Sequence, residues 1–222
     1  MADEKMKITS CNLILCEGKD EVLFLNQYLF WLKEQGVFEK SDPNVQIINF
    51  GGVKEFKRKL RVIVKAPGFQ DVRSILIIQD AETDADASRR SICDNLKNNG
   101  LPAPSRAAEW ERNDAMKLAY LLFPKLDGYP TNGTLEDLCV TIIDKSYNPD
   151  AVIELIENDM SNLESRELRA FPHKHKSKLH GFFSLTDRFV GDKVGEAAAA
   201  GAFDWNNEKL SVLKRMIIEN ME

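Results

Sequence analysis

The 222-residue sequence predicts an α/β fold, with a parallel sheet of about four strands flanked by helices and a helical C-terminal extension. Short apolar runs alternate with segments of helical length over the first two thirds of the chain, which is typical of right-handed βαβ units. Beyond about residue 150 the segments are helical in pattern, and no convincing strand appears. We therefore expect an α/β domain over 1–150 and a helical extension over 151–222 that packs on it as one compact unit.

Apolar runs and helix stop signals place the individual elements. Four runs rich in Leu, Ile and Val predict strands over 9–16, 45–50, 72–80 and 116–125. The apolar spacing and glycine stops of the intervening segments predict helices over 19–36, 53–66, 85–100 and 133–144, with a turn at 41–44. The extension reads as helical over 149–160, 178–190, 195–203 and 211–221.

Composition and charge limit the class of protein. The chain is 43% hydrophobic and 29% charged, and it has no apolar run of roughly 18 residues and no signal-like N-terminus. The four cysteines form no CxxC pair, so we expect reduced thiols in a cytoplasmic protein, with neither a zinc site nor a disulfide framework; they are Cys11, Cys16, Cys93 and Cys139. The net charge of -5 means that contact with nucleic acid would need local basic patches or metal ions.

Carboxylates follow two of the predicted strands at the points where these end. Glu17 follows the first strand, and Asp80 and Glu82 follow the third. Ligands of open parallel sheets bind beyond the carboxyl ends of the strands, so these acids converge if the two strands are neighbours. Glu21 lies one helical turn after Glu17, and Gly18 leaves room for a metal ion or a phosphate. Clustered carboxylates suit Mg²⁺ or Mn²⁺.

A structural alternative exists for some of these acids. A single acidic residue at a strand end commonly caps a helix or lies in solvent. Asp84 and Asp86 can serve as metal ligands or simply cap the helix that starts near Ala85, where negative charge is favoured. Two clusters, each directly after a buried strand, favour the metal interpretation for the others.

Two stretches resemble the signatures of the Toprim domain. "LILCEGKDEVLFL" resembles the first, a hydrophobic strand followed by Glu-Gly-x-x-acid, and "SILIIQDAETD" resembles the second, a strand followed by Asp-x-Asp. Glu21 stands where the first motif often has Asp, and Glu82 replaces the second Asp of the other motif. Both departures keep a carboxylate but place it on a side chain that is longer by one methylene group. The resemblance implies a Toprim-like sheet.

The resemblance extends over most of the chain. "INFGGVKEF", "GTLEDL" and the tail from "HKHKSKLHGFFSL" resemble stand-alone Toprim proteins of bacteria and archaea, which are similar to the Toprim part of the overcoming-lysogenization-defect nucleases. That group implies two metals held by the motif acids, a further Glu and a downstream Lys. By position, the implied ligands are Glu17, Glu21 (or Asp20), Asp80, Glu82 and Glu136. Of the candidate lysines Lys174, Lys176 and Lys178, we choose Lys178, because it opens the helix "KLHGFFSL".

These features together predict a Mg²⁺- or Mn²⁺-dependent phosphodiesterase acting on nucleic acid, DNA more than RNA. Glu17 would act as general base or acid and Lys178 would offset transition-state charge. Basic residues available for the substrate are Lys54, Lys57, Arg58, Arg61, Lys174 and Lys176. The alternative is that the first four form a solvated helix face and that the last two lie in a flexible loop before a helix. A metal site at His173 and His175 is disfavoured by the adjacent lysines.

Two other functions remain open at this point. The chain can be a non-catalytic accessory module that binds metal, nucleotide or a protein partner. Such a partner includes a separate ATPase, because this sequence has no GxxxxGK[ST] motif. Alternatively, it can be a receiver-like phosphate switch in which Asp80 is modified. No membrane association is expected, and the sequence leaves the oligomeric state open.

Overall fold

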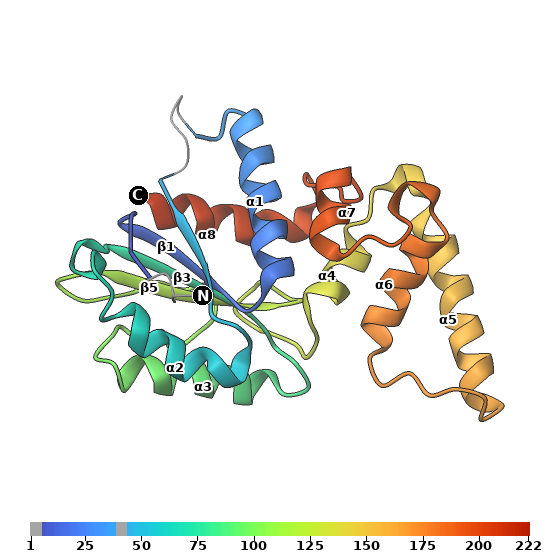
Figure 1. Cartoon of the computed structure of the whole chain (residues 1–222), viewed down its shortest axis with the longest axis horizontal. Helices are drawn as coiled ribbons and strands as arrows, with labels where there is room; N and C mark the ends of the chain where they lie inside the picture. The colour runs from blue at the N-terminus through green and yellow to red at the C-terminus, as the bar shows by residue number, and fades with distance from the viewer. Residues whose placement is uncertain (1–5, 39–43) are drawn as a thin grey trace, which may run out of the picture.

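The protein has an α/β fold built on one five-stranded sheet (Figure 1). A computed structural model describes residues 6–38 and 44–222, so most of the predicted turn at 41–44 lies outside the described residues. The strand order is β2-β1-β3-β5-β4, with β4 antiparallel to β5 and all other pairs parallel. The strands are β1 (Asn12–Cys16), β2 (Gln46–Asn49), β3 (Ser74–Asp80), β4 (Glu111–Arg112) and β5 (Lys117–Phe123).

The predicted parallel sheet is confirmed, with one strand added. The central strands β1, β3 and β5 are buried at every position, because helices cover both faces of the sheet, and this explains their continuous apolar runs. β1 is shorter than the predicted 9–16, and Thr9 instead donates its backbone N–H to the side chain of Gln46. The additional strand β4 consists of two exposed charged residues, which carry no strand pattern.

Eight α-helices occur among the described residues. They are α1 (Lys19–Glu34), α2 (Val53–Ile63), α3 (Ala85–Lys97), α4 (Leu135–Thr141), α5 (Pro149–Ser165), α6 (Lys174–Ser184), α7 (Val194–Ala200) and α8 (Ser211–Met221). Short 3₁₀ helices lie at Phe69–Asp71, Lys145–Tyr147, Asp187–Phe189 and Glu208–Leu210. Every predicted helix is present with shifted ends; α4 begins at Leu135 rather than 133 because Thr134 and Asp137 form a capping box there.

The helices form a layer on each face of the sheet. α2 and α3 lie on one face, and α1 and α8 lie on the other (Figure 1). The last helix belongs to this second layer, since Leu213, Met216 and Ile217 are fully buried in its core. Asn220 is also buried, accepts a hydrogen bond from Ser74 and donates one to the backbone of β1. The C-terminal extension thus closes over the sheet, while the division at residue 150 stays a prediction.

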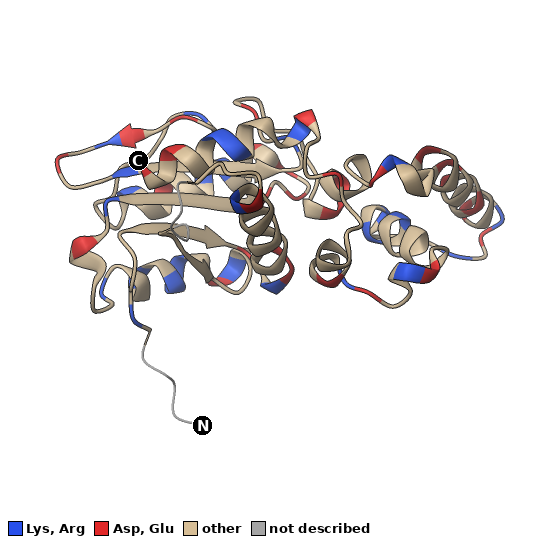
Figure 2. Cartoon of the chain, turned by 90° about the horizontal axis from the view of Figure 1, so that it is seen from above, with Lys and Arg blue, Asp and Glu red and all other residues tan. Residues whose placement is uncertain are grey.

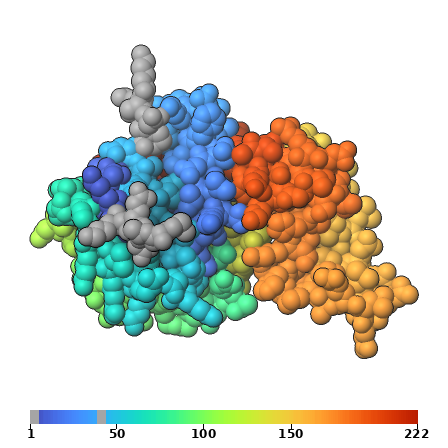
Figure 3. Space-filling view, in the orientation of Figure 1, coloured from blue at the N-terminus to red at the C-terminus, as the bar shows by residue number. Residues whose placement is uncertain are grey.

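Helices α5 and α6 project from one end of the sheet. Acidic residues of α5 face basic residues of α6 (Figure 2), with Lys174 bonded to Glu164 at 2.7 Å and Lys178 to Glu157 at 2.6 Å. α7 lies against α1, and the two pack side by side in the space-filling view (Figure 3). Their close approach depends on Gly195 of α7, because an added Cβ there would overlap the side chain of Leu23 on α1.

Two further findings concern membrane-spanning helices and the cysteine thiols. Over 6–38 and 44–222, no helix is both long enough and apolar enough to cross a bilayer. All four cysteines are free thiols, and three of them are buried.

The connections of the sheet create a crevice beside β1. From β1 the chain passes through α1 to β2 on one side, and then returns through α2, on the opposite face, to β3 on the other side. Open α/β sheets bind ligands where the chain reverses its strand order in this way. The carboxyl ends of β1 and β3 therefore mark the place to look for a functional site.

Candidate metal centre

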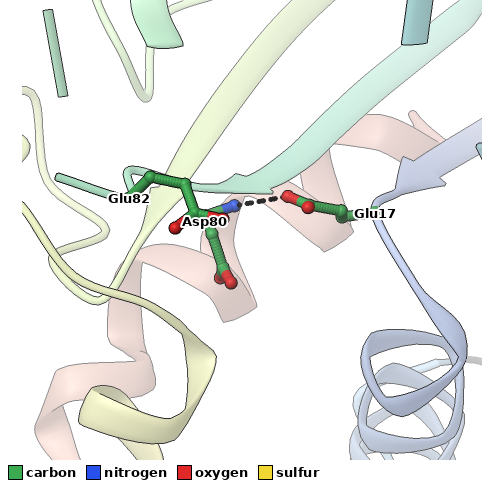
Figure 4. Close-up of side chains that lie close together, drawn as sticks. All are labelled: Glu17, Asp80 and Glu82. Carbon is green, nitrogen blue, oxygen red and sulfur yellow. Dashed lines mark hydrogen bonds between the residues drawn. The ribbon is translucent and has the colours of Figure 1, made fainter. Parts of the chain in front are cut away.

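Three carboxylates meet at the carboxyl ends of β1 and β3. Glu17 directly follows β1, Asp80 is the last residue of β3, and Glu82 lies two residues further on. One oxygen from each lies within 4.8 Å of the others (Figure 4). The convergence expected from the sequence is therefore present, and three oxygens at this spacing could hold one hard divalent cation. The metal itself stays a prediction.

Backbone groups fix two of these carboxylates. A carboxylate oxygen of Glu17 accepts a hydrogen bond from the backbone N–H of Asp80 at 3.4 Å (Figure 4). One oxygen of Asp80 accepts the backbone N–H of Leu135, the first residue of α4, at 2.8 Å. A carboxylate at a helix N-terminus is favoured by the unpaired N–H groups there. The other oxygen of Asp80 accepts no hydrogen bond among the described residues and is available to a cation.

Glu82 is held in an unusual backbone conformation. Its φ of 56° is left-handed, which is strained for a residue other than glycine. Two backbone hydrogen bonds of 2.8 and 2.9 Å pair it with Gly133. Gly133 has a φ of 137°, and an added Cβ would lie 2.8 Å from a carboxylate oxygen of Asp137. The loop before α4 thus fixes Glu82, and this fixing requires glycine at position 133.

Burial and mutual repulsion disfavour negative charge in the cluster. Burial raises the pKa of Glu17 to about 7, and the charges of Glu21 and Glu82 add to this effect. Hydrogen bonds from the backbone of Asp80 and Val53 lower this pKa, but by less. Burial, followed by the charges of Glu17 and Glu21, raises the pKa of Asp80 to about 9. A divalent cation would offset this repulsion and draw both groups into their charged form.

Glu21 and Glu136 lie around the cluster without joining it. The charges of both raise the pKa of Asp80, so both are near it. Glu21 is buried, and its carboxylate occupies the space beside Gly18, where an added Cβ would lie 2.7 Å from its oxygen. Asp20 acts on Glu21 through its charge. These three predicted ligands therefore form an outer group of acids.

The lysine that reaches these acids is Lys176. It lies 3.3 Å from a carboxylate oxygen of Glu136, whereas Lys178 is paired with Glu157. Burial lowers the pKa of Lys176, but the charges of Glu136, Asp80 and Glu21 outweigh burial and raise it. The sequence-based choice of Lys178 is not supported by this arrangement, because residues two apart on a helix point to opposite sides.

Asp84 serves as the cap of α3. One of its oxygens accepts the backbone N–H of Ala87 at 2.9 Å, and another lies 4.0 Å from Arg90. Asp84 is exposed, and Asp86 pairs with Arg89 at 3.5 Å. The capping alternative left open by the sequence therefore describes Asp84 better than a ligand role.

The basic residues of α2 lie on its outer surface. Lys54, Lys57, Arg58 and Arg61 are all exposed, while Phe56 is buried beneath them. Arg58 is paired with Glu55 at 2.6 Å. The other three form no ion pair with an acid among the described residues, and they line a surface hollow together with Lys59 and Lys65.

A protein-family model matches residues 11–220, which include both strand ends, the acids and Lys176. The chain belongs to the DUF3226 family. The family is described as a protein of unknown function. No curated protein and no solved structure matches the chain. The site of this DUF3226 chain is therefore interpreted from its own geometry.

Sequence reasoning missed two contributors to the site of this DUF3226 chain. The backbone N–H of Leu135 holds Asp80, and Gly133 holds Glu82. A usable signal was present, because Thr134 and Asp137 have the spacing of a capping box and mark Leu135 as the start of a helix. Nothing in the sequence indicates that this helix start meets the end of β3.

Proposed function

We propose that this DUF3226 chain is a Toprim-like phosphodiesterase that depends on Mg²⁺ or Mn²⁺ and acts on nucleic acid, DNA more than RNA. The proposal depends on one observation, the meeting of Glu17, Asp80 and Glu82 within 4.8 Å at the crevice between β1 and β3. A divalent cation bound there would act as a Lewis acid on a phosphoryl oxygen and would activate water.

The residues around the cluster supply distinct parts of this chemistry. Glu17, with a pKa of about 7, can take up or release a proton near neutral pH, as a general base or acid requires. Asp80, fixed by Leu135, anchors the cation. Lys176 lies close enough to the acids to neutralise charge that develops on the phosphoryl group.

Binding of a polyanion needs local positive charge, because the whole chain carries -5. Acidic and basic residues are interspersed along the ribbon in the view of Figure 2. The exposed Lys54, Lys57 and Arg61 of α2 are the candidate phosphate contacts, since α2 begins beside Glu17. Lys174 is paired with Glu164 and serves the α5–α6 contact instead.

The test is nicking of supercoiled plasmid by the purified protein with Mn²⁺. We expect nicking that chelation abolishes and that Glu17→Gln or Asp80→Asn lowers by at least about a hundredfold. Glu154→Gln is the matched control, since Glu154 is an exposed acid on α5, and it should nick like the unaltered protein. Nicking that persists unchanged in both cluster variants would contradict the proposal.

Calorimetric titration with Mn²⁺ separates catalysis from binding alone. Metal binding that depends on Glu17 and Asp80, without nicking of any nucleic acid, would favour the non-catalytic accessory module. The receiver-like switch predicts instead that acetyl phosphate modifies Asp80. Its exposure of 8% and its bond to Leu135 leave little room for a phosphoryl group there, which disfavours this alternative.

A further inference from the structure

A second hollow opens one residue beyond Glu82, on the α3 side of the cluster. It is lined by the start of α3 with Arg89, by a segment that includes Arg106, and by the loop that carries Tyr129 and Asn132. Its volume is about 490 Å³, within the range of small-molecule sites in proteins. None of the three cluster carboxylates, Glu17, Asp80 and Glu82, lines it.

The loop on one side of the hollow is tied to the start of α3. Asn132 accepts the backbone N–H of Ala85 at 3.0 Å and donates to the carbonyl oxygen of Thr83 at 2.6 Å. The adjacent Gly133 is bonded to Glu82. The walls of the hollow are thereby connected to the metal cluster through backbone hydrogen bonds, so the hollow and the cluster have a fixed relative position.

The hollow is lined by an aromatic residue and two arginines, together with the acids Asp84 and Asp86. Tyr129 is an aromatic residue with 73% of its surface exposed, so it is accessible to a ligand. Arg89 and Arg106 supply two guanidinium groups. Their acidic partners lie at 3.5 and 3.8 Å in exposed pairs, which are weak interactions that a phosphate can displace. Aromatic faces and guanidinium planes are the usual platforms for unpaired bases.

One buried hydroxyl lacks a hydrogen-bond partner among the described residues. Tyr120 is fully buried in β5, and its hydroxyl oxygen has no hydrogen-bond partner among the described residues. It lies close enough to Arg89 and Asp86, both lining residues, for their charges to act on it. Tyr120 is not among the residues that line the hollow, so its hydroxyl is not assigned to the ligand site.

We propose that this hollow binds one unpaired nucleotide of the strand whose phosphate lies at the Glu17–Asp80–Glu82 cluster. In this arrangement Tyr129 stacks on the base, and Arg89 and Arg106 contact the neighbouring phosphates. The proposal rests on the proposed function and narrows its substrate class to single-stranded or frayed nucleic acid, because a base within a duplex cannot enter the hollow without unpairing.

The experiment uses a single-stranded DNA of about 12 nucleotides that carries 2-aminopurine, with EDTA present, so that its result does not depend on metal binding. We expect stacking to quench the 2-aminopurine fluorescence. Tyr129→Ala should abolish this quenching and weaken binding about tenfold, whereas Tyr129→Phe should retain both. Phe30→Ala is the matched control, because Phe30 is an aromatic residue with 60% exposure on α1, and this variant should behave like the unaltered protein.

Three results would overturn the proposal: no binding of the single strand, unchanged quenching in Tyr129→Ala, or an equal loss in Phe30→Ala. A matched duplex should bind without dependence on Tyr129, and the same dependence there would also contradict it. Failure of the proposed function is a separate result. It appears as absent Mn²⁺ binding or absent nicking, and it leaves the metal-free measurement on Tyr129 unaffected.

Discussion

Asp80 and Glu17 are carboxylates placed where their charge is disfavoured. Asp80 is buried at the end of β3 and held by the first N–H of α4, and Glu17 bonds to the backbone of Asp80. Neither a strand end nor a helix cap requires two further acids nearby, yet Glu21 and Glu82 also lie there. Such a group costs stability in the metal-free protein, and a bound cation would recover it.

This cost predicts how the stability of the metal-free protein depends on pH. The pKa of Glu17 rises from 4.5 to about 7 and that of Asp80 from 3.8 to about 9 on folding. Between about pH 4 and about pH 9, the folded chain therefore binds more protons than the unfolded chain. The contribution of both groups to the free energy of unfolding is full below about pH 4 and is lost as the pH rises through about 7 and about 9. Thermal unfolding in EDTA over this range measures the loss.

Asp80→Asn is the matched variant for this measurement, because the amide oxygen can still accept the N–H of Leu135. It removes the charge and its dependence on pH. At about pH 9 the variant should unfold at a temperature higher than that of the unaltered protein, by roughly 2–4 °C for each kcal/mol of relieved repulsion. The prediction would be contradicted if the variant were less stable than the unaltered protein at pH 9 and if its stability depended on pH in the same way. That result would show that the charge of Asp80 does not destabilise the folded protein.

Lys176 and Lys178 provide a matched pair on one helix. Lys176 lies against Glu136 beside the cluster, whereas Lys178 is paired with Glu157 of α5. We expect Lys176→Ala to lower the nicking rate by about a hundredfold, since it removes a positive group near the reacting phosphate. Lys178→Ala should leave the nicking rate close to that of the unaltered protein. Equal losses in the two variants, or a larger loss in Lys178→Ala, would argue against this assignment.

The last helix, α8, stabilises the sheet that carries the site. Its apolar side chains are buried against the strands, with Leu213 fully inaccessible to solvent. Leu213→Ala should therefore lower the free energy of unfolding by about 2–5 kcal/mol, measured by urea denaturation. Leu185→Ala is the control, because Leu185 is 69% exposed, and its effect should stay within about 0.5 kcal/mol. A small effect of Leu213→Ala would mean that α8 does not pack firmly on the sheet.

The elements were largely predictable from the sequence because burial leaves a strong pattern. β1, β3 and β5 are covered on both faces and read as continuous apolar runs, and the helices follow apolar spacing and glycine stops. The strand β4 was not predictable, since Glu111 and Arg112 are exposed and are paired only through their backbone with β5. The ends of α2 and α4 differ because caps and turns, rather than periodicity, fix them.

The candidate site was predictable only in part, for a geometric reason. Strand ends are local features, so Glu17 and Asp80 could be placed together once their strands were taken as neighbours. The lysine was not predictable, because the rotation of α6 about its own axis decides which of Lys176 and Lys178 faces the acids. The hollow at Tyr129 joins segments far apart in the chain, and no motif in the sequence indicates it.

At the scale of the whole molecule, the candidate functional groups lie together at one edge of the sheet. The carboxyl ends of β1 and β3 carry the acids, and α2, α3 and α4 all begin at this edge (Figure 1). At the start of α4, the backbone N–H of Leu135 holds Asp80. α6 brings Lys176 to the same place from the C-terminal part of the chain. The extension thus supplies part of the site as well as part of the core.

The most direct measurement is anomalous X-ray diffraction from a crystal of the protein soaked in Mn²⁺. We expect a manganese peak bound by oxygens of Glu17, Asp80 and Glu82, at about 2.1 Å from its ligands, and no such peak in a crystal of Asp80→Asn. A crystal in which these three carboxylates lie together as described and the manganese peak is absent, or lies elsewhere, would contradict the account.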